Sequence, residues 1–183
     1  MIAAASRLFT TNGWVSTGMR DVAAEAGVST ETVYSYFSSK RRLLESVIDI
    51  AVVGDDNPVA VSERPEFAAL GQGTRVDRIA SAARLVSVIH QRTGPFAKVI
   101  REAASSDTQI AEVLRATRER QRQDTEAGIT LIIGRKPTPA ERDGVWVILS
   151  PETYLLLVEE SGWTFHQYQS WLAETLEHVL PSP

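Results

Sequence analysis

Hydroxyl and aromatic side chains are concentrated in one short segment near the N-terminus, GVSTETVYSYFSSK at residues 27–40. Serine and threonine carry hydroxyls on short side chains that donate and accept hydrogen bonds, which suits contacts to phosphates and base edges. Tyrosine places the same group on a rigid ring, and a lysine at a helix start adds a cation to free backbone N–H groups. We therefore predict contacts with a grooved, phosphate-rich partner. The candidate residues are Ser29, Thr30, Thr32, Tyr34, Tyr36 and Lys40.

Two short helices joined by a glycine-containing turn are predicted to position this segment. Apolar residues recur at helical spacing over 2–12, and a glycine follows them. Thr17 is the predicted N-cap of a second helix over 18–26, and Ser29 or Thr30 caps a third. Such a pair is the pattern of a helix-turn-helix, in which the second helix enters the DNA major groove. The pair alone also fits a plain helical bundle with a hydroxyl-rich turn.

A longer stretch carries a family resemblance. GWVSTGMRDVAAEAGVSTETVYSYFSSKRRLLESV, residues 13–47, resembles the DNA-binding head of the TetR family of transcriptional regulators. The shared features are a Gly-aromatic pair, an AGVS turn, a T-V-Y-x-Y-F helix and a following S-K-x-x-L. The stretch 54–66 and the C-terminal SPETYLLLVEESGWTFHQYQSWLAETL further resemble an actinobacterial-type branch of that family.

The resemblance implies an all-α fold with a three-helix, helix-turn-helix DNA-binding head over residues 1–41. A larger helical body over 42–183 is then expected to bind a small molecule and to form a homodimer. The implied function is that of a cytoplasmic transcriptional repressor, bound to a palindromic double-stranded DNA operator and released by a small-molecule effector. By position in the family pattern, Thr17 and Arg20 join the candidates for DNA contact.

Two departures from the family pattern leave an alternative function open. Gly18 stands where the family often has Ser or Thr, and the chain begins inside the family's first helix. Members usually carry a few more residues there, often basic, that reach DNA. Fewer phosphate contacts would weaken DNA binding and flatten its salt dependence. The alternative is a degenerate member that binds a small molecule or a partner without tight DNA binding.

Composition and motifs exclude several other classes of function. The 183 residues are 43% hydrophobic, enough for a core, and include no cysteine for disulfides, thiol catalysis or thiolate metal sites. The histidines lack metal-ligand spacing, and no nucleophile motif or phosphate-binding loop occurs. No apolar run reaches the ~20 residues of a membrane span, and the N-terminus is unlike a signal peptide. We predict no enzymatic activity, metal, cofactor or membrane association.

The distribution of charge bears on the predicted DNA partner. The net charge is -4, but residues 1–50 contain five Lys or Arg and five Asp or Glu, so the acidity lies in residues 51–183. Lys40–Arg42 is the one basic cluster of the first part, and clustered charge is what matters for phosphate contact.

The rest of the chain is predicted to be helical after a linker over 54–73. Glycines and prolines bound the expected helices, which lie near 74–92, 95–106, 107–133, 138–149, 151–161 and 164–180. A ligand cavity needs mostly apolar walls and a few polar groups, although each candidate also fits a plain core. The candidate ligand residues are Leu85, Val88, Ile89, Arg92, Phe96, Val99, Ile100, Thr117, Gln121 and Trp146.

Two further segments of the body have predicted roles. The charged run 115–126 is interpreted as a solvated, partly salt-bridged helix face, whose polar middle could also line a cavity. The last helices are more apolar than one body needs, which favours a four-helix dimer interface over internal packing alone. The candidate interface residues are Val147, Tyr154, Leu155, Val158, Trp171, Leu172, Leu176 and Val179.

Overall fold

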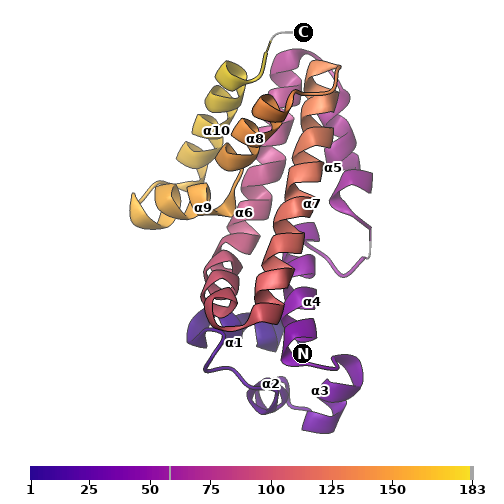
Figure 1. Cartoon of the computed structure of the whole chain (residues 1–183), viewed down its shortest axis with the longest axis vertical. Helices are drawn as coiled ribbons and strands as arrows, with labels where there is room; N and C mark the ends of the chain where they lie inside the picture. The colour runs from indigo at the N-terminus through magenta and orange to yellow at the C-terminus, as the bar shows by residue number, and fades with distance from the viewer. Residues whose placement is uncertain (58, 182–183) are drawn as a thin grey trace.

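A computed structural model describes residues 1–57 and 59–181, and all regular elements in these ranges are helical. The molecule is elongated, with the N-terminal helices at one end and the C-terminus at the other (Figure 1). The expected all-α architecture is confirmed. The head consists of α1 (Ile2–Asn12), α2 (Met19–Ala26) and α3 (Thr30–Tyr36), and α4 (Lys40–Val53) connects it to the body.

The body is built around two long helices that run side by side, α6 and α7 (Figure 1). Short turns lead into them from α4, and a group of shorter helices covers them afterwards. In chain order the body elements are η1 (Val61–Glu63), α5 (Pro65–Ala68), η2 (Ala69–Gly71), α6 (Arg75–Ser106), α7 (Thr108–Ile133), α8 (Pro139–Ile148), α9 (Pro151–Tyr154), the π-helical η3 (Leu155–Glu160) and α10 (Phe165–Val179).

The predicted N-cap of α3 is confirmed, and the predicted N-cap of α2 is wrong. Ser29 caps α3, since its hydroxyl accepts a hydrogen bond from the Thr32 backbone N–H at 3.1 Å. The N-cap of α2 is Gly18 rather than the predicted Thr17, and its N–H donates to the Asp21 carboxylate at 2.7 Å. Thr17 is buried, and its hydroxyl lies within hydrogen-bond distance of two backbone oxygens of the α1 end.

The predicted break at residues 93–95 is wrong, because α6 continues through Pro95 as one helix of 32 residues. A proline inside a helix removes one hydrogen bond and costs roughly 3 kcal/mol. Packing outweighs this cost, since α6 contacts α1, α4, α7, α9 and α10 along its length. Gly94 allows one of these contacts, because a Cβ there would lie 3.1 Å from the Tyr154 ring.

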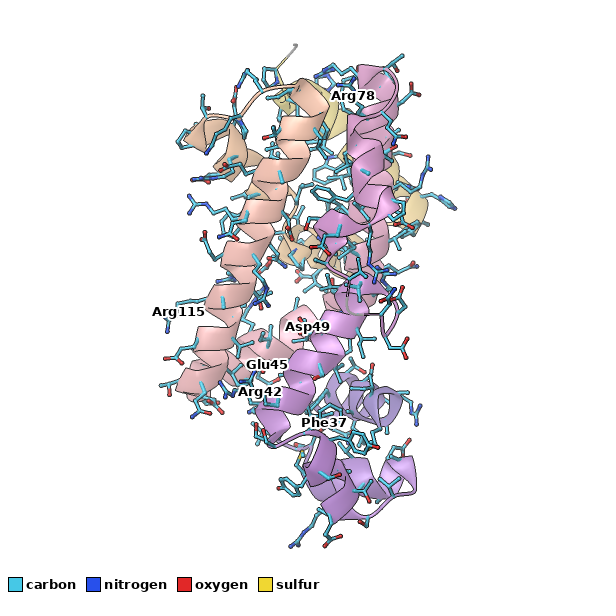
Figure 2. All side chains as sticks on the ribbon, turned by 90° about the vertical axis from the view of Figure 1, so that its right-hand side faces the viewer. Phe37, Arg42, Glu45, Asp49, Arg78 and Arg115 are labelled. Atoms are coloured by element: carbon cyan, nitrogen blue, oxygen red, sulfur yellow. The ribbon has the colours of Figure 1, made fainter. Side chains whose placement is uncertain are left out.

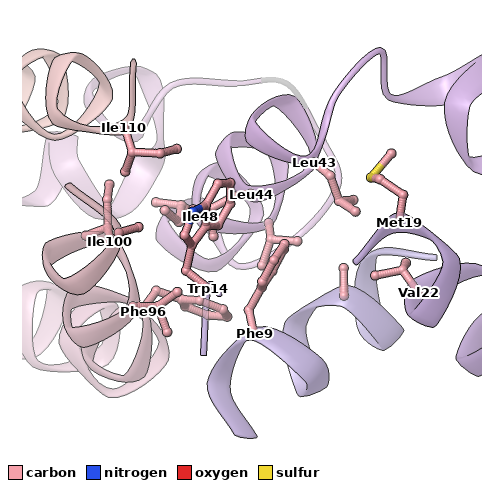
Figure 3. Close-up of a cluster of buried hydrophobic side chains, with 14 of the residues drawn as sticks. Phe9, Trp14, Met19, Val22, Leu43, Leu44, Ile48, Phe96, Ile100 and Ile110 are labelled. Carbon is pink, nitrogen blue, oxygen red and sulfur yellow. The ribbon is translucent and has the colours of Figure 1, made fainter. Parts of the chain in front are cut away.

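One apolar cluster joins the head to the body. Phe9 of α1 is fully buried and stacks with Trp14, with ring centroids 5.9 Å apart. Phe96 and Ile100 from the C-terminal half of α6 pack into the same cluster, as does Ile110 of α7 (Figure 3). Burial of this surface therefore fixes the head against the base of α6 and α7.

A second cluster fills the far end of the body, around a buried histidine. His90 Nδ1 lies 2.7 Å from the hydroxyl of Tyr168, and the Tyr154 ring meets Tyr168 edge-on at 5.0 Å between centroids. Burial lowers the pKa of His90 to about 4, although a hydrogen bond with the Leu149 backbone acts in the opposite direction. Burial also raises the pKa of Tyr168, so its phenol stays protonated and can donate to the neutral imidazole.

This second cluster corrects half of the predicted dimer residues. Tyr154, Leu155, Leu172 and Leu176 are buried in it within a single chain, because α9, η3 and α10 cover α6 with these side chains. The other candidates remain at least partly accessible. They are Val147, Val158, Trp171 and Val179.

The charged run on α7 is a salt-bridged face, as predicted, but its shortest ion pairs are made with other helices. Arg122 pairs with Asp143 of α8 at 2.5 Å, and Arg118 pairs with Glu152 of α9 at 2.8 Å. Each of these pairs spans two elements, so the charges help to position α8 and α9 on α7.

The junction cluster makes a clear prediction for stability. Phe9→Ala removes a fully buried ring and should lower the free energy of unfolding by about 3–5 kcal/mol, measured by urea denaturation. Val15→Ala, at a side chain that is 74% exposed, is the matched control and should change it by less than about 0.5 kcal/mol. Equal effects would contradict the described packing.

His90 should make stability depend on pH. Its folded pKa of about 4 lies below the ordinary histidine value of 6.5, so the unfolded chain binds the proton more readily. The stabilisation that neutral His90 gives is complete above pH 6.5. As the pH falls toward 4, the free energy of unfolding decreases by about 3 kcal/mol because of this residue. Urea titrations from pH 7 to 4 should show a smaller loss in His90→Gln than in the wild type. The exposed His166→Gln variant is the control and should match the wild type.

Candidate nucleic-acid interface and body cavity

The recognition helix α3 shows one face to the core and one to solvent. Val33 is fully buried, and Phe37 packs against the junction cluster (Figure 2). Tyr34 and Tyr36 lie on the two flanks of the helix beside this buried side, and they are 52% and 70% exposed. Both rings are therefore accessible to a partner.

Most of the predicted contact residues gather on or beside this face. Ser29 and Thr32 lie at the start of α3, with their hydroxyls 3.1 Å apart. Thr30 is the first residue of the helix and is half-buried, whereas Arg20 is exposed on α2. The arrangement places hydroxyls at the N-terminal end of α3, the end that approaches base edges in helix-turn-helix proteins.

Two predicted residues lie differently. The hydroxyl of Thr17 is buried inside the head, so this side chain fixes the turn before α2 instead of reaching a partner. Lys40 packs over the Trp14 ring at 4.1 Å from its centroid, and its Nζ donates to the Trp14 carbonyl. Burial lowers the pKa of Lys40, with Asp107 and Asp21 acting in the opposite direction. Lys40 thus ties the start of α4 to the α1–α2 turn.

The body contains a cavity of about 680 Å³ between α4, α6 and α7. Its walls are mainly aliphatic, and its volume falls within the range of small-molecule sites. Four of the predicted ligand residues line it, namely Leu85, Ile89, Thr117 and Gln121. The polar middle of run 115–126 therefore does line a cavity, which was one of the two interpretations of that run.

The other six predicted ligand residues do not line the cavity. Phe96, Val99 and Ile100 belong to the junction cluster, because the continuous α6 carries them past the cavity to the head. Val88 is exposed, and Trp146 is outside the lining. Arg92 instead donates to the Val52 carbonyl at 2.8 Å, at the C-terminal end of α4.

Sequence reasoning missed the charged residues of the lining. Asp49 and Asp124 face the cavity from α4 and α7, together with Arg120. Burial raises the pKa of both carboxylates, and Arg120 lowers them. A carboxylate inside the apolar stretch VIDIAVV was the available signal for Asp49. Asp124 had no such signal within its charged run.

The segment predicted as a linker covers one side of the cavity. Lining residues from this segment include Asp55, Asn57 and Val61. Arg64 holds the segment by a bidentate ion pair with Asp55, at 2.7 and 2.9 Å, and donates to the Val59 carbonyl at 3.1 Å. The Arg64 guanidinium lowers the pKa of Asp55 to about 2. Residues 55–57 and 59–60, between α4 and η1, thus form a wall of the cavity.

Two searches of the described part of the chain gave negative results. No cluster of three or more His, Asp or Glu residues suited to a metal ion occurs among residues 1–57 and 59–181. Over the same residues, no helix combines the length and the apolar character needed to cross a membrane.

Comparisons with known proteins agree with this architecture. The family model described as "Bacterial regulatory proteins, tetR family" matches residues 1–47. No curated protein matches the chain. A crystal structure of a TetR-family transcriptional regulator from Rhodococcus sp. has a TM-score of 0.65 at 16% identity, over 98% of this chain and 96% of that one. The multidrug binding protein EbrR, complexed with imidazole, has a TM-score of 0.60 at 16% identity, over 100% and 93%.

These matches cover the two parts of the chain in different ways. The family model covers the helix-turn-helix head and the first half of α4, and the solved structures share the fold over the head and the body. The actinobacterial branch and the domain boundary at residue 41 stay predictions. Residues 1–47 match the TetR family of bacterial regulatory proteins, and the whole chain shares the fold of the two solved structures.

Proposed function

We propose that this protein is a repressor that binds a palindromic DNA operator as a homodimer and leaves it when a small molecule enters the body. The observation that carries the proposal is the outward face of α3. Its exposed tyrosines and the hydroxyls at its start are presented at one end of an elongated molecule. In a helix-turn-helix, this is the surface that enters the major groove.

The path from cavity to head supports release by a ligand. α4 begins at Lys40, which is tied to the head through Trp14, and Asp49 and Val53 farther along the same helix line the cavity. A smaller cavity of about 320 Å³ lies between α4 and α7 toward the head and shares Asp49 with the large one (Figure 2). A ligand that binds better to one position of α4 would therefore change how often the head adopts each of its orientations.

The small-molecule part of the proposal has one further support. EbrR shares the fold and is described as a multidrug binding protein complexed with imidazole. A cavity of about 680 Å³ gives the body of this chain the space for a comparable role.

In-vitro selection of random duplex DNA on the purified protein, in low salt, tests the proposal. Enrichment of a palindrome is the expected result, because a two-fold symmetric dimer reads two equivalent half-sites. Failure to enrich any sequence would support the alternative of a family member that does not grip DNA, and the term repressor would then be withdrawn.

The recognition face gives a prediction for binding. Tyr36→Ala should weaken affinity for the selected operator by about tenfold, or about 1.4 kcal/mol, because an exposed contact at the groove is lost. Thermal stability should be nearly unchanged, since the residue is 70% exposed. His166→Ala on α10 is the control and should bind as the wild type. Unchanged affinity in Tyr36→Ala would remove this residue from the interface.

The homodimer has its own test. Val147, Leu156 and Val179 are 58%, 54% and 42% exposed. They lie on α8, η3 and α10, and α10 contacts both of the other two elements. We expect the double variant Val147→Glu/Val179→Glu to sediment as a monomer at micromolar concentration, because like charges would meet across a two-fold interface. Val76→Glu on α6 is the exposed apolar control. A wild type that sediments as a monomer would contradict the proposed interface.

A further inference from the structure

We propose that the body cavity selects an organic cation, an apolar molecule that carries one positively charged group. The inference rests on the proposed role of this cavity as the effector site and specifies the chemistry of its ligand. It comes from the charges, partners and apolar walls of the lining, taken in turn below.

The charged lining is strongly unbalanced. Four carboxylates face the cavity, from Asp49, Asp55, Asp56 and Asp124, against the one guanidinium of Arg120. Asp55 is neutralised by its bidentate pair with Arg64. Three carboxylates then remain against one cation, a net charge of about -2 on the described lining, since the buried His90 stays neutral. A positive ligand is attracted by this lining and a negative one is repelled.

Two of these carboxylates lack an internal partner. Among the described residues, neither Asp49 nor Asp124 forms a hydrogen bond or an ion pair within 4.0 Å. Arg120 lies near enough to lower the pKa of both, but its own hydrogen bond goes to the Thr117 hydroxyl at 3.4 Å. Asp49 is exposed and Asp124 is half-buried, and partial desolvation works against ionisation at both sites. A ligand cation beside them would therefore stabilise the charged form.

The two acids lie on different helices that border the same cavity. Asp49 lies on the flank of α4 that is turned toward α7 (Figure 2), and Asp124 belongs to α7. A cation between them would contact both helices at once. Such a contact would act on the helix that carries the head, which an apolar ligand deeper in the body would not do to the same degree.

The rest of the lining favours a ligand that is mostly apolar and carries few hydrogen-bond acceptors. The hydroxyls of Thr93 and Thr125 donate to the Ile89 and Gln121 carbonyls at 2.8 Å, so only their acceptor lone pairs remain. Aliphatic side chains form most of the other surface, among them Leu85, Val86, Ile129, Ile132 and Val145. A lipophilic cation suits both the acidic and the aliphatic parts of the lining. A carboxylate or phosphate compound would instead meet hydrogen-bond acceptors and negatively charged side chains.

Calorimetric titration of the full-length protein with two ions of the same shape and opposite charge tests the inference. Tetraphenylphosphonium is the cation and tetraphenylborate the anion, and the cation should bind at least about tenfold more tightly. Asp124→Asn and Asp49→Asn should each weaken cation binding by about tenfold. Glu119→Gln, on the exposed side of α7 away from the cavity, should bind as the wild type. Thermal melting of each variant confirms that the comparison is between folded proteins.

Each outcome of this titration decides the inference. Equal or tighter binding of the anion, or no binding of the cation up to about 1 mM, would overturn it. Cation binding that is unchanged in both aspartate variants would also overturn it, because the apolar walls alone would then account for the affinity. No DNA is present, so failure of operator selection together with selective cation binding would reject the repressor and keep the ligand class. Enrichment of an operator without cation binding would support the repressor and reject the ligand class.

Discussion

The burial of apolar side chains where the head meets the base of α6 and α7 is the constraint on which the molecule depends. A helix as short as α3, seven residues, is not stable in isolation, and α1 and α2 are little longer. They fold because Phe9, Trp14 and Val33 share one cluster with α4, α6 and α7. The exposed face of α3 is thus held in place by contacts on its opposite side and by the body itself.

The same arrangement explains why the connecting helix matters. α4 contributes buried residues to the junction cluster, such as Leu43 and Leu44, and its later turns border the cavity. The same short helix, α4, therefore contributes both to the stability of the head and to the cavity wall. The ion pair of Asp55 with Arg64 and the contact of Arg92 with the α4 terminus hold the far end of that element. Its position is defined at both ends by named contacts.

The head could be predicted from the sequence because its signals are local. Capping by Ser29, the glycine turns and the family pattern all lie within a few residues of the feature that they specify. Thr17 was misplaced because a hydroxyl near a helix start has two possible partners, the next helix or the previous one, and tertiary packing decided between them. The cavity was only partly predicted because its walls come from α4, α6, α7 and residues 55–57 and 59–61, which sequence spacing does not bring together. The buried α10 residues assigned to a dimer show the same limit, since an apolar stripe does not state which surface covers it.

Pro95 was expected to begin a new helix after a break at residues 93–95, and it marks a different boundary instead. Ile79, Ala82 and Ala83 before it belong to the far cluster, and Phe96, Val99 and Ile100 after it belong to the junction cluster. One backbone hydrogen bond is missing at the place where the two clusters meet. The two halves of α6 are therefore buried by different clusters within one unbroken helix. Amide protons on the two sides of Pro95 need not be equally protected, because each side depends on the packing of its own cluster.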